Sequence, residues 1–303
     1  MKQNAVKIDN LTCRFADVTA VRNLSLSVPS GCIYAIVGKN GAGKTTTIRA
    51  LMGMVRPDGG RAEILGFDCT AQGERARRHV GYLPESRSLY GYMRVDELLR
   101  FARSFHGDWD DALVNRYLEL FEIPRRRVTS QLSAGMRTQL GLILALAHNP
   151  RVLILDEPIA HLDVARVRQL LTIMLSEAAA KEQTVLISSH ALHHVERVAD
   201  HVAIIDRGRL VLEKPLEDMK VDEKRIRVAF QVDPPEDLFD HPAVTQVRNE
   251  GRKYLVTVCG SADDIVDRCS RIPHFALEVI DMNLEDIFLE YTDRRGGVDG
   301  HDA

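Results

Sequence analysis

The segment that most constrains this chain is Gly38-Lys-Asn-Gly-Ala-Gly-Lys-Thr45, which fills every fixed position of the pattern G-x-x-x-x-G-K-[ST]. It follows the apolar run Ile33-Tyr-Ala-Ile-Val37 and precedes residues 46–53, whose composition suits a helix. A strand, a glycine-rich turn and a helix N-terminus form a phosphate-binding loop, because backbone amides and the helix dipole converge on an anion. The sequence therefore predicts a site for a nucleoside triphosphate.

Each residue type in this loop suits phosphate. Gly38, Gly41 and Gly43 have no side chain to keep phosphate oxygens away from the backbone amides. Lys44 is expected to reach the outer phosphates as a point charge, and the Thr45 hydroxyl is expected to ligate Mg²⁺. The predicted nucleotide-binding residues of the loop are Gly38, Asn40, Gly41, Ala42, Gly43, Lys44, Thr45 and Thr46.

Length, charge and cysteine content argue against nucleic-acid binding and against a zinc or disulfide framework. A chain of 303 residues can hold one large domain or two. The net charge of −3 gives no sign of a nucleic-acid-binding surface, so no nucleic-acid partner is expected. The five cysteines are scattered and form no C-x-x-C pair, which favours reduced thiols over a zinc site or a disulfide framework.

The sequence contains no obvious membrane segment. The N-terminal residues lack the apolar core of a signal peptide. The longest apolar run, Leu140–Ala147, is far shorter than the roughly 20 residues that cross a bilayer as a helix. We therefore expect a soluble chain that works at a membrane only through a partner.

The first 217 residues alternate between strand and helix patterns. Up to about residue 66, short alternating segments predict strands, and from about 70 to 150 the periodicity is helical, as in residues 94–103 and 111–121. Near-continuous apolar runs then return, which is typical of buried parallel strands with helices between them. These runs are Val152–Leu155, Thr184–Ser188 and His201–Ile205. We predict an α/β domain over 1–217 with a helical subdomain over about 73–150.

The rest of the chain has a different pattern. Predicted strands at 225–230, 253–258 and 275–280 alternate with predicted helices at 262–269 and 283–291. We expect a small α+β accessory domain over 218–293, for packing or dimer contact rather than ligand sensing. The Gly- and Asp-rich residues 294–303 are expected to be a disordered tail.

Two acids follow one of the predicted buried strands directly. Asp156 is expected at the carboxyl edge of that strand, where ligand sites lie in open α/β sheets, and there it would share Mg²⁺ with Thr45. Glu157 is the candidate to polarise an attacking water. Its alternative is a surface acid beside the turn at Pro158.

The segment Leu132-Ser-Ala-Gly-Met136 comes before a long apolar stretch. Ser133 can cap a helix by accepting a hydrogen bond from the amide near residue 136. Read alone, this pattern indicates only a capped, buried helix, which is a common element.

The order of these motifs resembles that of the nucleotide-binding subunits of ATP-binding cassette (ABC) transporters, over about residues 5–215. The resemblance implies a P-loop NTPase core with an antiparallel β subdomain and a helical subdomain. It also implies ATP and Mg²⁺ as cofactors, with two ATPs held between two subunits. Ser133 and Gly135 would then face the γ-phosphate of the partner's ATP. Ala134 and Met136 depart from the usual Leu-Ser-Gly-Gly-Gln.

Three further positions match the family in order. Phe15 takes the place of the aromatic residue that stacks on adenine, although a buried core phenylalanine is an equal alternative. Glu85 stands where a hinge glutamine normally senses Mg²⁺ and touches the membrane partner. His190 matches the switch histidine at the γ-phosphate; its alternative is a surface histidine at a strand end. The implied catalytic residues are Lys44, Glu157 and His190, and the implied metal ligands are Thr45, Glu85 and Asp156.

The largest departure lies in the segment from Ile159 to Asp163. Leu162 and Asp163 match the family pattern Thr-Ser-Gly-Leu-Asp, but His161 replaces its glycine with a bulky group that titrates near neutral pH. This exchange could alter communication between the two ATP sites and slow turnover.

The resemblance implies an ATPase motor subunit that pairs with a second copy of itself and drives separate integral membrane permease subunits. Residues 81–85, 135–137 and 283–290 resemble the ATPases of bacterial exporters. The expected location is cytoplasmic, at the inner face of the cell membrane through the permease. Two alternatives are an ABC-type ATPase that acts on DNA or ribosomes, and a regulatory module with weak turnover.

Overall fold

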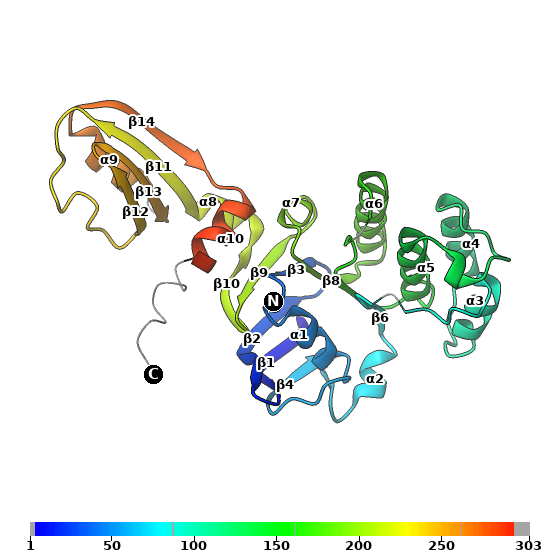
Figure 1. The fold of residues 1–303 in the computed structure, drawn as a ribbon. Helices are drawn as coiled ribbons and strands as arrows, with labels where there is room; N and C mark the ends of the chain where they lie inside the picture. Colours follow the sequence, from blue (N-terminus) through cyan, green and yellow to red (C-terminus); the bar gives the residue numbers. More distant parts are fainter. Residues whose placement is uncertain (1–3, 87, 161, 261, 294–303) are drawn as a thin grey trace. The chain divides into compact units, whose positions relative to one another are not determined.

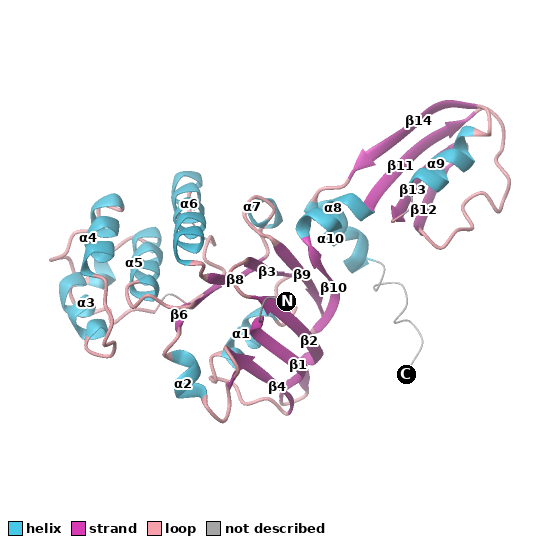
Figure 2. Ribbon diagram, turned by 180° about the vertical axis from the view of Figure 1, so that it is seen from behind, coloured by secondary structure: helices cyan, strands magenta, loops and turns pink. Residues whose placement is uncertain are grey.

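The chain divides into two units, residues 1–213 and residues 214–303. The computed structural model describes residues 4–86, 88–160, 162–260 and 262–293. His161 and the predicted disordered tail, 294–303, lie outside the described residues. Figures 1 and 2 show each unit built on its own sheets.

A six-stranded sheet forms the centre of the first unit, in the order β10-β9-β3-β8-β7-β6. β3 runs parallel to β8 and β9, and β7 runs parallel to β6 and β8. The strands are β3 (Ile33–Val37), β6 (Val80–Leu83), β7 (Val152–Asp156), β8 (Thr184–Ser189), β9 (His201–Asp206) and β10 (Arg209–Pro215). The carboxyl ends of the parallel strands β3, β6, β7, β8 and β9 therefore meet at one edge of the sheet, where the predicted site residues follow β3, β7 and β8.

Both faces of this sheet are buried, which explains the continuous apolar runs in the sequence. In β7, Leu153 and Leu155 belong to the core shared with the helices. Val152 and Ile154 belong to the opposite core. Since successive side chains point to opposite faces, every position of such a strand must be apolar.

A second, antiparallel sheet covers one face, in the order β2-β1-β4-β5. Its strands are β1 (Asn4–Phe15), β2 (Val18–Pro29), β4 (Gly59–Ile64) and β5 (Phe67–Asp68). Inward-facing residues such as Ile8, Leu24 and Ile64 are fully buried in the core of that face. This sheet is the predicted antiparallel β subdomain.

Helices follow the strands and cover the remaining surfaces. Figure 1 shows α3, α4 and α5 gathered at one end of the unit, beyond the edge strand β6. The helices of this unit are α1 (Lys44–Leu51), α2 (Gly73–Arg77), α3 (Val95–Arg103), α4 (Asp111–Leu120), α5 (Ala134–Leu146), α6 (Val164–Lys181) and α7 (Leu192–Val195).

One strand lies inside the interval that the sequence pattern predicts to be helical. β6 is too short to show alternation, and it begins only after the helix α2. It packs closely against α5: a Cβ added at Gly81 would lie 2.1 Å from the Ala145 carbonyl oxygen. The close approach of helix and strand explains why a glycine occupies this strand.

The second unit is an antiparallel sheet in the order β12-β13-β11-β14. Ile265 and Cys269 of α9 pack with Ile226, Val228 and Val256 in a separate core, and Figure 1 shows α9 against one face of the sheet. The elements are α8 (Leu216–Asp222), β11 (Glu223–Phe230), β12 (Val244–Glu250), β13 (Lys253–Cys259), α9 (Ala262–Ser270), β14 (His274–Asp281) and α10 (Leu284–Asp293). The predicted α/β core and small α+β domain are both present.

Candidate functional site

The phosphate loop joins β3 to α1 and is shaped by its glycines. Gly41 and Gly43 have φ angles of 80° and 102°, which non-glycine residues rarely adopt. A Cβ at Gly38 would lie 2.4 Å from the Ile205 carbonyl oxygen, and one at Gly43 would lie 2.5 Å from the Ala20 carbonyl oxygen. These glycines therefore let the loop pass close to β9 and β2 as well as leaving the amides open to phosphate.

Lys44 is buried at the start of α1, and its ammonium group turns back over the loop. Nζ donates to the Gly38 carbonyl oxygen at 2.8 Å and to the Lys39 carbonyl oxygen at 3.3 Å. It also pairs with Oε1 of Glu157 at 3.2 Å. The predicted lysine is thus a buried cation that links the loop to the predicted general base.

Asp156 ends β7 with only 1% of its surface exposed. Its Oδ1 accepts hydrogen bonds from Ser188 Oγ at 2.5 Å and from Thr45 Oγ1 at 3.2 Å. Burial raises the pKa of this carboxyl group, and the hydrogen bonds from Ser188 and Thr45 oppose the rise. The structure brings the two predicted metal ligands Thr45 and Asp156 together.

These oxygens fit a magnesium ion. Oδ2 of Asp156 is buried and has no hydrogen-bond partner among the described residues. Thr45 Oγ1 lies 3.5 Å from Oε2 of Glu85, so the third predicted ligand also approaches. A hydroxyl and carboxylates are hard oxygen ligands, which Mg²⁺ prefers together with phosphate and water. Within the described ranges, no group of three or more His, Cys, Asp or Glu side chains offers an alternative metal site.

Glu157 follows immediately and is held in an unusual backbone conformation. Its φ of 49° lies in the left-handed region, which costs a non-glycine residue about 1–3 kcal/mol. Its amide donates to the carbonyl oxygen and the hydroxyl oxygen of Ser188, at 3.2 and 3.0 Å. Such a conformation persists only where the surroundings impose it, and such residues cluster at functional sites.

The Glu157 carboxylate lies between two cationic or titratable groups. One oxygen pairs with Lys44, and the other lies 2.9 Å from Nδ1 of His190. The His190 side chain is 50% exposed while that of Glu157 is 5% exposed. This histidine therefore faces both the acid and the solvent at the end of β8, and its role as the switch histidine stays a prediction. Glu157 is buried and not a surface acid.

Ser188 is a residue of the site that no motif in the sequence marks. It is fully buried near the end of β8, and its hydroxyl bridges both acids, donating to Asp156 and accepting from the Glu157 amide. Only the parallel pairing of β7 with β8, which sets Asp156 opposite Ser188, reveals this role. Buried serines at the end of a strand whose centre, Val185–Ile187, is apolar are a weak signal that could have pointed to it.

Phe15 ends β1 with 47% of its surface exposed. The alternative of a buried core phenylalanine is therefore wrong, and its ring is accessible as adenine stacking requires. Of the other predicted loop residues, Asn40 is exposed, Ala42 is buried and Thr46 is half-buried.

The predicted signature residues lie at the start of α5. Ser133 caps the helix, because its Oγ accepts a hydrogen bond from the Met136 amide at 3.2 Å. Among the described residues, no hydrogen bond or ion pair joins Ser133 or Gly135 to the phosphate loop of the same chain. The two predicted parts of the site are therefore not bonded to each other within the described part of one chain.

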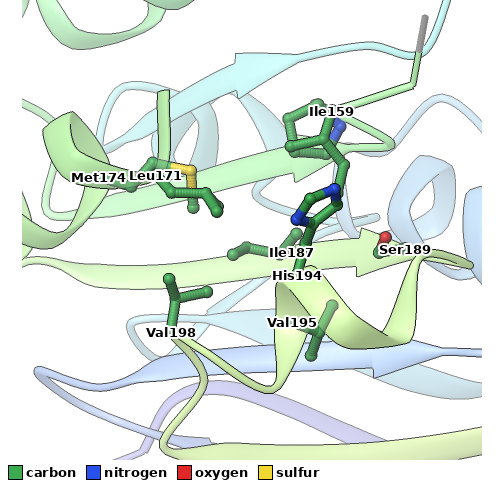
Figure 3. Close-up of a pocket in the computed structure, with 9 residues that line it drawn as sticks. Ile159, Leu171, Met174, Ile187, Ser189, His194, Val195 and Val198 are labelled. Atoms are coloured by element: carbon green, nitrogen blue, oxygen red, sulfur yellow. The ribbon is translucent and has the colours of Figure 1, made fainter. Parts of the chain in front are cut away.

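A small apolar pocket lies behind the acids, between α6, α7 and β8 (Figure 3). Figure 3 shows His194 directed into it beside Ile159 and Ile187. Since Ser189 and His194 are its only polar lining residues, this pocket is unsuited to a triphosphate. In the part of the chain that the structure describes, no helix is long and apolar enough to cross a membrane.

Comparison with known proteins agrees with this geometry. Residues 21–160 match the family model described as ABC transporter. The bacitracin transport ATP-binding protein of Bacillus licheniformis is 33% identical over 217 residues, which cover 71% of each chain. The Nod factor export ATP-binding protein I of Burkholderia lata is 36% identical over 209 residues, which cover 67% of this chain and 68% of that protein.

A solved structure of an ATP-binding subunit of an ABC transporter superposes with a TM-score of 0.65 and 29% identity, over 72% of this chain and 92% of that one. The superposition confirms the predicted P-loop core. From the relatives, the matched segment and the shared fold, it follows that this chain belongs to the ABC transporter family, as an ATP-binding subunit.

Proposed function

We propose that this chain is the Mg²⁺-dependent ATPase motor of an ABC transporter, which pairs with a second copy around two ATPs and drives separate membrane permease subunits. The observation that carries the proposal is the placement of Glu157. Its buried carboxylate directly follows Asp156 and is held between Lys44 and His190 at the mouth of the phosphate loop.

Each residue of the site has a distinct role in the proposed hydrolysis of ATP. Lys44 and the loop amides bind the phosphates, and Thr45, Asp156 and Glu85 would hold Mg²⁺, which supplies positive charge to the phosphate oxygens. Glu157 orients the attacking water and accepts its proton. His190 restrains the second Glu157 oxygen and, being half exposed, can also reach the γ-phosphate. Charge stabilisation by these fixed groups supplies most of the catalysis.

Pairing of two copies is supported by the lack of a bond between the phosphate loop and the start of α5 in one chain. Ser133 and the first turn of α5 present a helix N-terminus, which favours an anion, yet they have no bonded link to their own loop. A second subunit supplies the phosphate that this helix start binds. Phe15, exposed at the end of β1, stacks on the adenine of the nucleotide in its own loop.

The permease surface is supported by exposed aromatic side chains near Glu85. Tyr90, Tyr92, Phe101 and Phe105 are 50%, 75%, 38% and 69% exposed. Successive rings pack edge to face, with centroids 5.4 Å apart for Tyr90 and Phe101 and 5.0 Å apart for Phe101 and Phe105. Exposed apolar patches mark interaction sites. Docking there would hold the chain at the cytoplasmic face of the membrane.

Export is the direction that the relatives favour, because one of them is named for Nod factor export and another for bacitracin transport. We propose the same for this chain, without a nucleic-acid partner. A regulatory subunit with weak turnover is the alternative, and the experiment below separates the two.

The test compares ATP hydrolysis and ATP-dependent dimerisation of the parent protein and its Glu157→Gln variant. We expect the parent to turn over Mg-ATP and the variant to lose at least about 100-fold in rate, a typical general-base effect, while ATP traps it as a dimer. The exposed Glu119 provides the control Glu119→Gln, with unchanged turnover. ATP binding without turnover or dimerisation would instead support the regulatory alternative.

A further inference from the structure

We propose that Arg166 binds the γ-phosphate of the ATP held by the partner subunit, together with Ser133. The inference rests on the proposed two-subunit site and adds a residue to it. Arg166 lies in the first turn of α6, and its side chain reaches across to the start of α5.

The contacts of Arg166 are specific. Nη1 donates to Ser133 Oγ at 3.1 Å, and Nε pairs with Oδ2 of Asp163 at 3.4 Å. Asp163 also caps α6, since its Oδ1 accepts from the Arg166 amide at 2.9 Å. The guanidinium group is thus tethered from two sides, and its side chain remains 33% exposed.

The guanidinium group lies directly against the first turn of α5. A Cβ added at Gly135 would lie 2.1 Å from Nη1 and 3.1 Å from Cζ of Arg166. The arginine side chain therefore packs directly over the Cα position of Gly135. Arg166 therefore joins Ser133, at the start of α5, to Asp163, at the start of α6.

The charge of this arrangement points to an anion. A helix N-terminus carries a partial positive charge, where acids are stabilising and cations are not. The first turn of α5 contains no acidic residue, and Asp163, the ion-pair partner of Arg166, is 62% exposed. A guanidinium group held against a positive helix end makes a concentrated positive site, and its planar N–H groups match phosphate oxygens.

The sequence at residues 132–136 also favours a binding role for Arg166. Met136 stands where the related signature carries glutamine, so the first turn of α5 has no side-chain amide to offer. Arg166 supplies hydrogen-bond donors at the same helix start. Because no hydrogen bond among the described residues joins Ser133 to its own phosphate loop, we assign the phosphate that meets this site to the ATP of the second copy.

The experiment uses the full chain with the Glu157→Gln substitution, because this variant should not consume the ATP during the measurement. Dimerisation against ATP concentration is measured by analytical ultracentrifugation, and ATP binding to the monomer is measured by calorimetry. Arg166→Gln should leave ATP binding to the monomer unchanged. It should weaken ATP-dependent dimerisation about tenfold for each of the two ATP sites, as expected for one charge-assisted hydrogen bond. Arg166→Lys should restore part of the loss. Arg168→Gln removes the same charge from an exposed position of α6 and should have no effect.

Each outcome decides the question. Dimerisation of the Arg166→Gln variant that equals or exceeds that of the Glu157→Gln parent overturns the inference and leaves the proposed function standing. Loss of ATP binding by the Arg166→Gln monomer also overturns it, because the effect is then in the subunit's own site. Failure of the Glu157→Gln parent to dimerise overturns the proposed function, and the inference with it.

Discussion

Replacing Ser188 with alanine should destabilise the protein and slow ATP hydrolysis, with a pH dependence that identifies the cause. The hydroxyl group donates to Asp156 at 2.5 Å and accepts from the Glu157 amide at 3.0 Å. Its removal leaves the Glu157 amide with the Ser188 carbonyl oxygen at 3.2 Å as an acceptor. It leaves Oδ1 of Asp156 with the hydrogen bond from Thr45 Oγ1 at 3.2 Å.

The magnitude follows from these two bonds. A hydrogen bond to a charged group contributes about 1.5–3 kcal/mol, and the second, shared bond contributes about 0.5 kcal/mol. We therefore expect the free energy of unfolding to fall by about 2–3.5 kcal/mol at pH near 7.5. The ATPase rate should also fall, because the left-handed conformation of Glu157 loses one of the groups that impose it.

The sign of the pH dependence can be worked out from Asp156. Burial raises the pKa of Asp156 in the folded protein above its unfolded value of about 3.9. The free energy of unfolding therefore falls as the pH rises from the unfolded pKa through the folded pKa. The Ser188 hydrogen bond opposes that rise in pKa. The alanine variant raises the folded pKa further. The deficit in the free energy of unfolding should thus be small at pH near 4 and grow as Asp156 ionises in the folded parent. It should be complete only once Asp156 is also ionised in the folded variant, whose pKa is the higher of the two.

The assay is urea unfolding followed by circular dichroism at pH near 4 and near 7.5, for the parent and the variant. Ser189→Ala is the matched control, because Ser189 is equally buried in β8 and, among the described residues, its hydroxyl is bonded to neither acid but accepts from the Ala191 amide at 3.0 Å. A deficit below about 0.5 kcal/mol at the higher pH would refute the reasoning, since ordinary surface changes reach that size. A deficit independent of pH would refute the link to Asp156.

Two further predictions concern the helical region. Gly81→Ala should lower the free energy of unfolding by about 1–3 kcal/mol, because the added methyl group meets the Ala145 carbonyl oxygen at 2.1 Å; Gly107→Ala, in open space, is the thermal-unfolding control. Glu177→Ala should cost about 1–3 kcal/mol in urea unfolding, because it leaves the buried Tyr117 hydroxyl without its carboxylate acceptor. An unchanged urea midpoint would show that this buried pair contributes nothing to stability.

The parts of the fold that could be predicted are those with strong local signals. The buried strands β7, β8 and β9 are continuous apolar runs, and α3 and α4 show helical periodicity. β12 was missed because its residues, Val-Thr-Gln-Val-Arg-Asn-Glu, are half-buried or exposed and carry no apolar pattern. α8 was missed because a short helix beside a domain boundary has little periodicity to detect.

The sequence by itself determined the chemistry of the site, because phosphate and magnesium restrict which residue types can serve. Lys44, Thr45, Asp156 and Glu157 could be named from spacing and neighbours alone. The tertiary structure decided which groups act on them. The order β3-β8-β7 brings Ser188 and His190 to the acids, and the packing of α6 beside α5 brings Arg166 to Ser133. Periodicity records which face of an element is buried, and it contains no information on which element lies next to it.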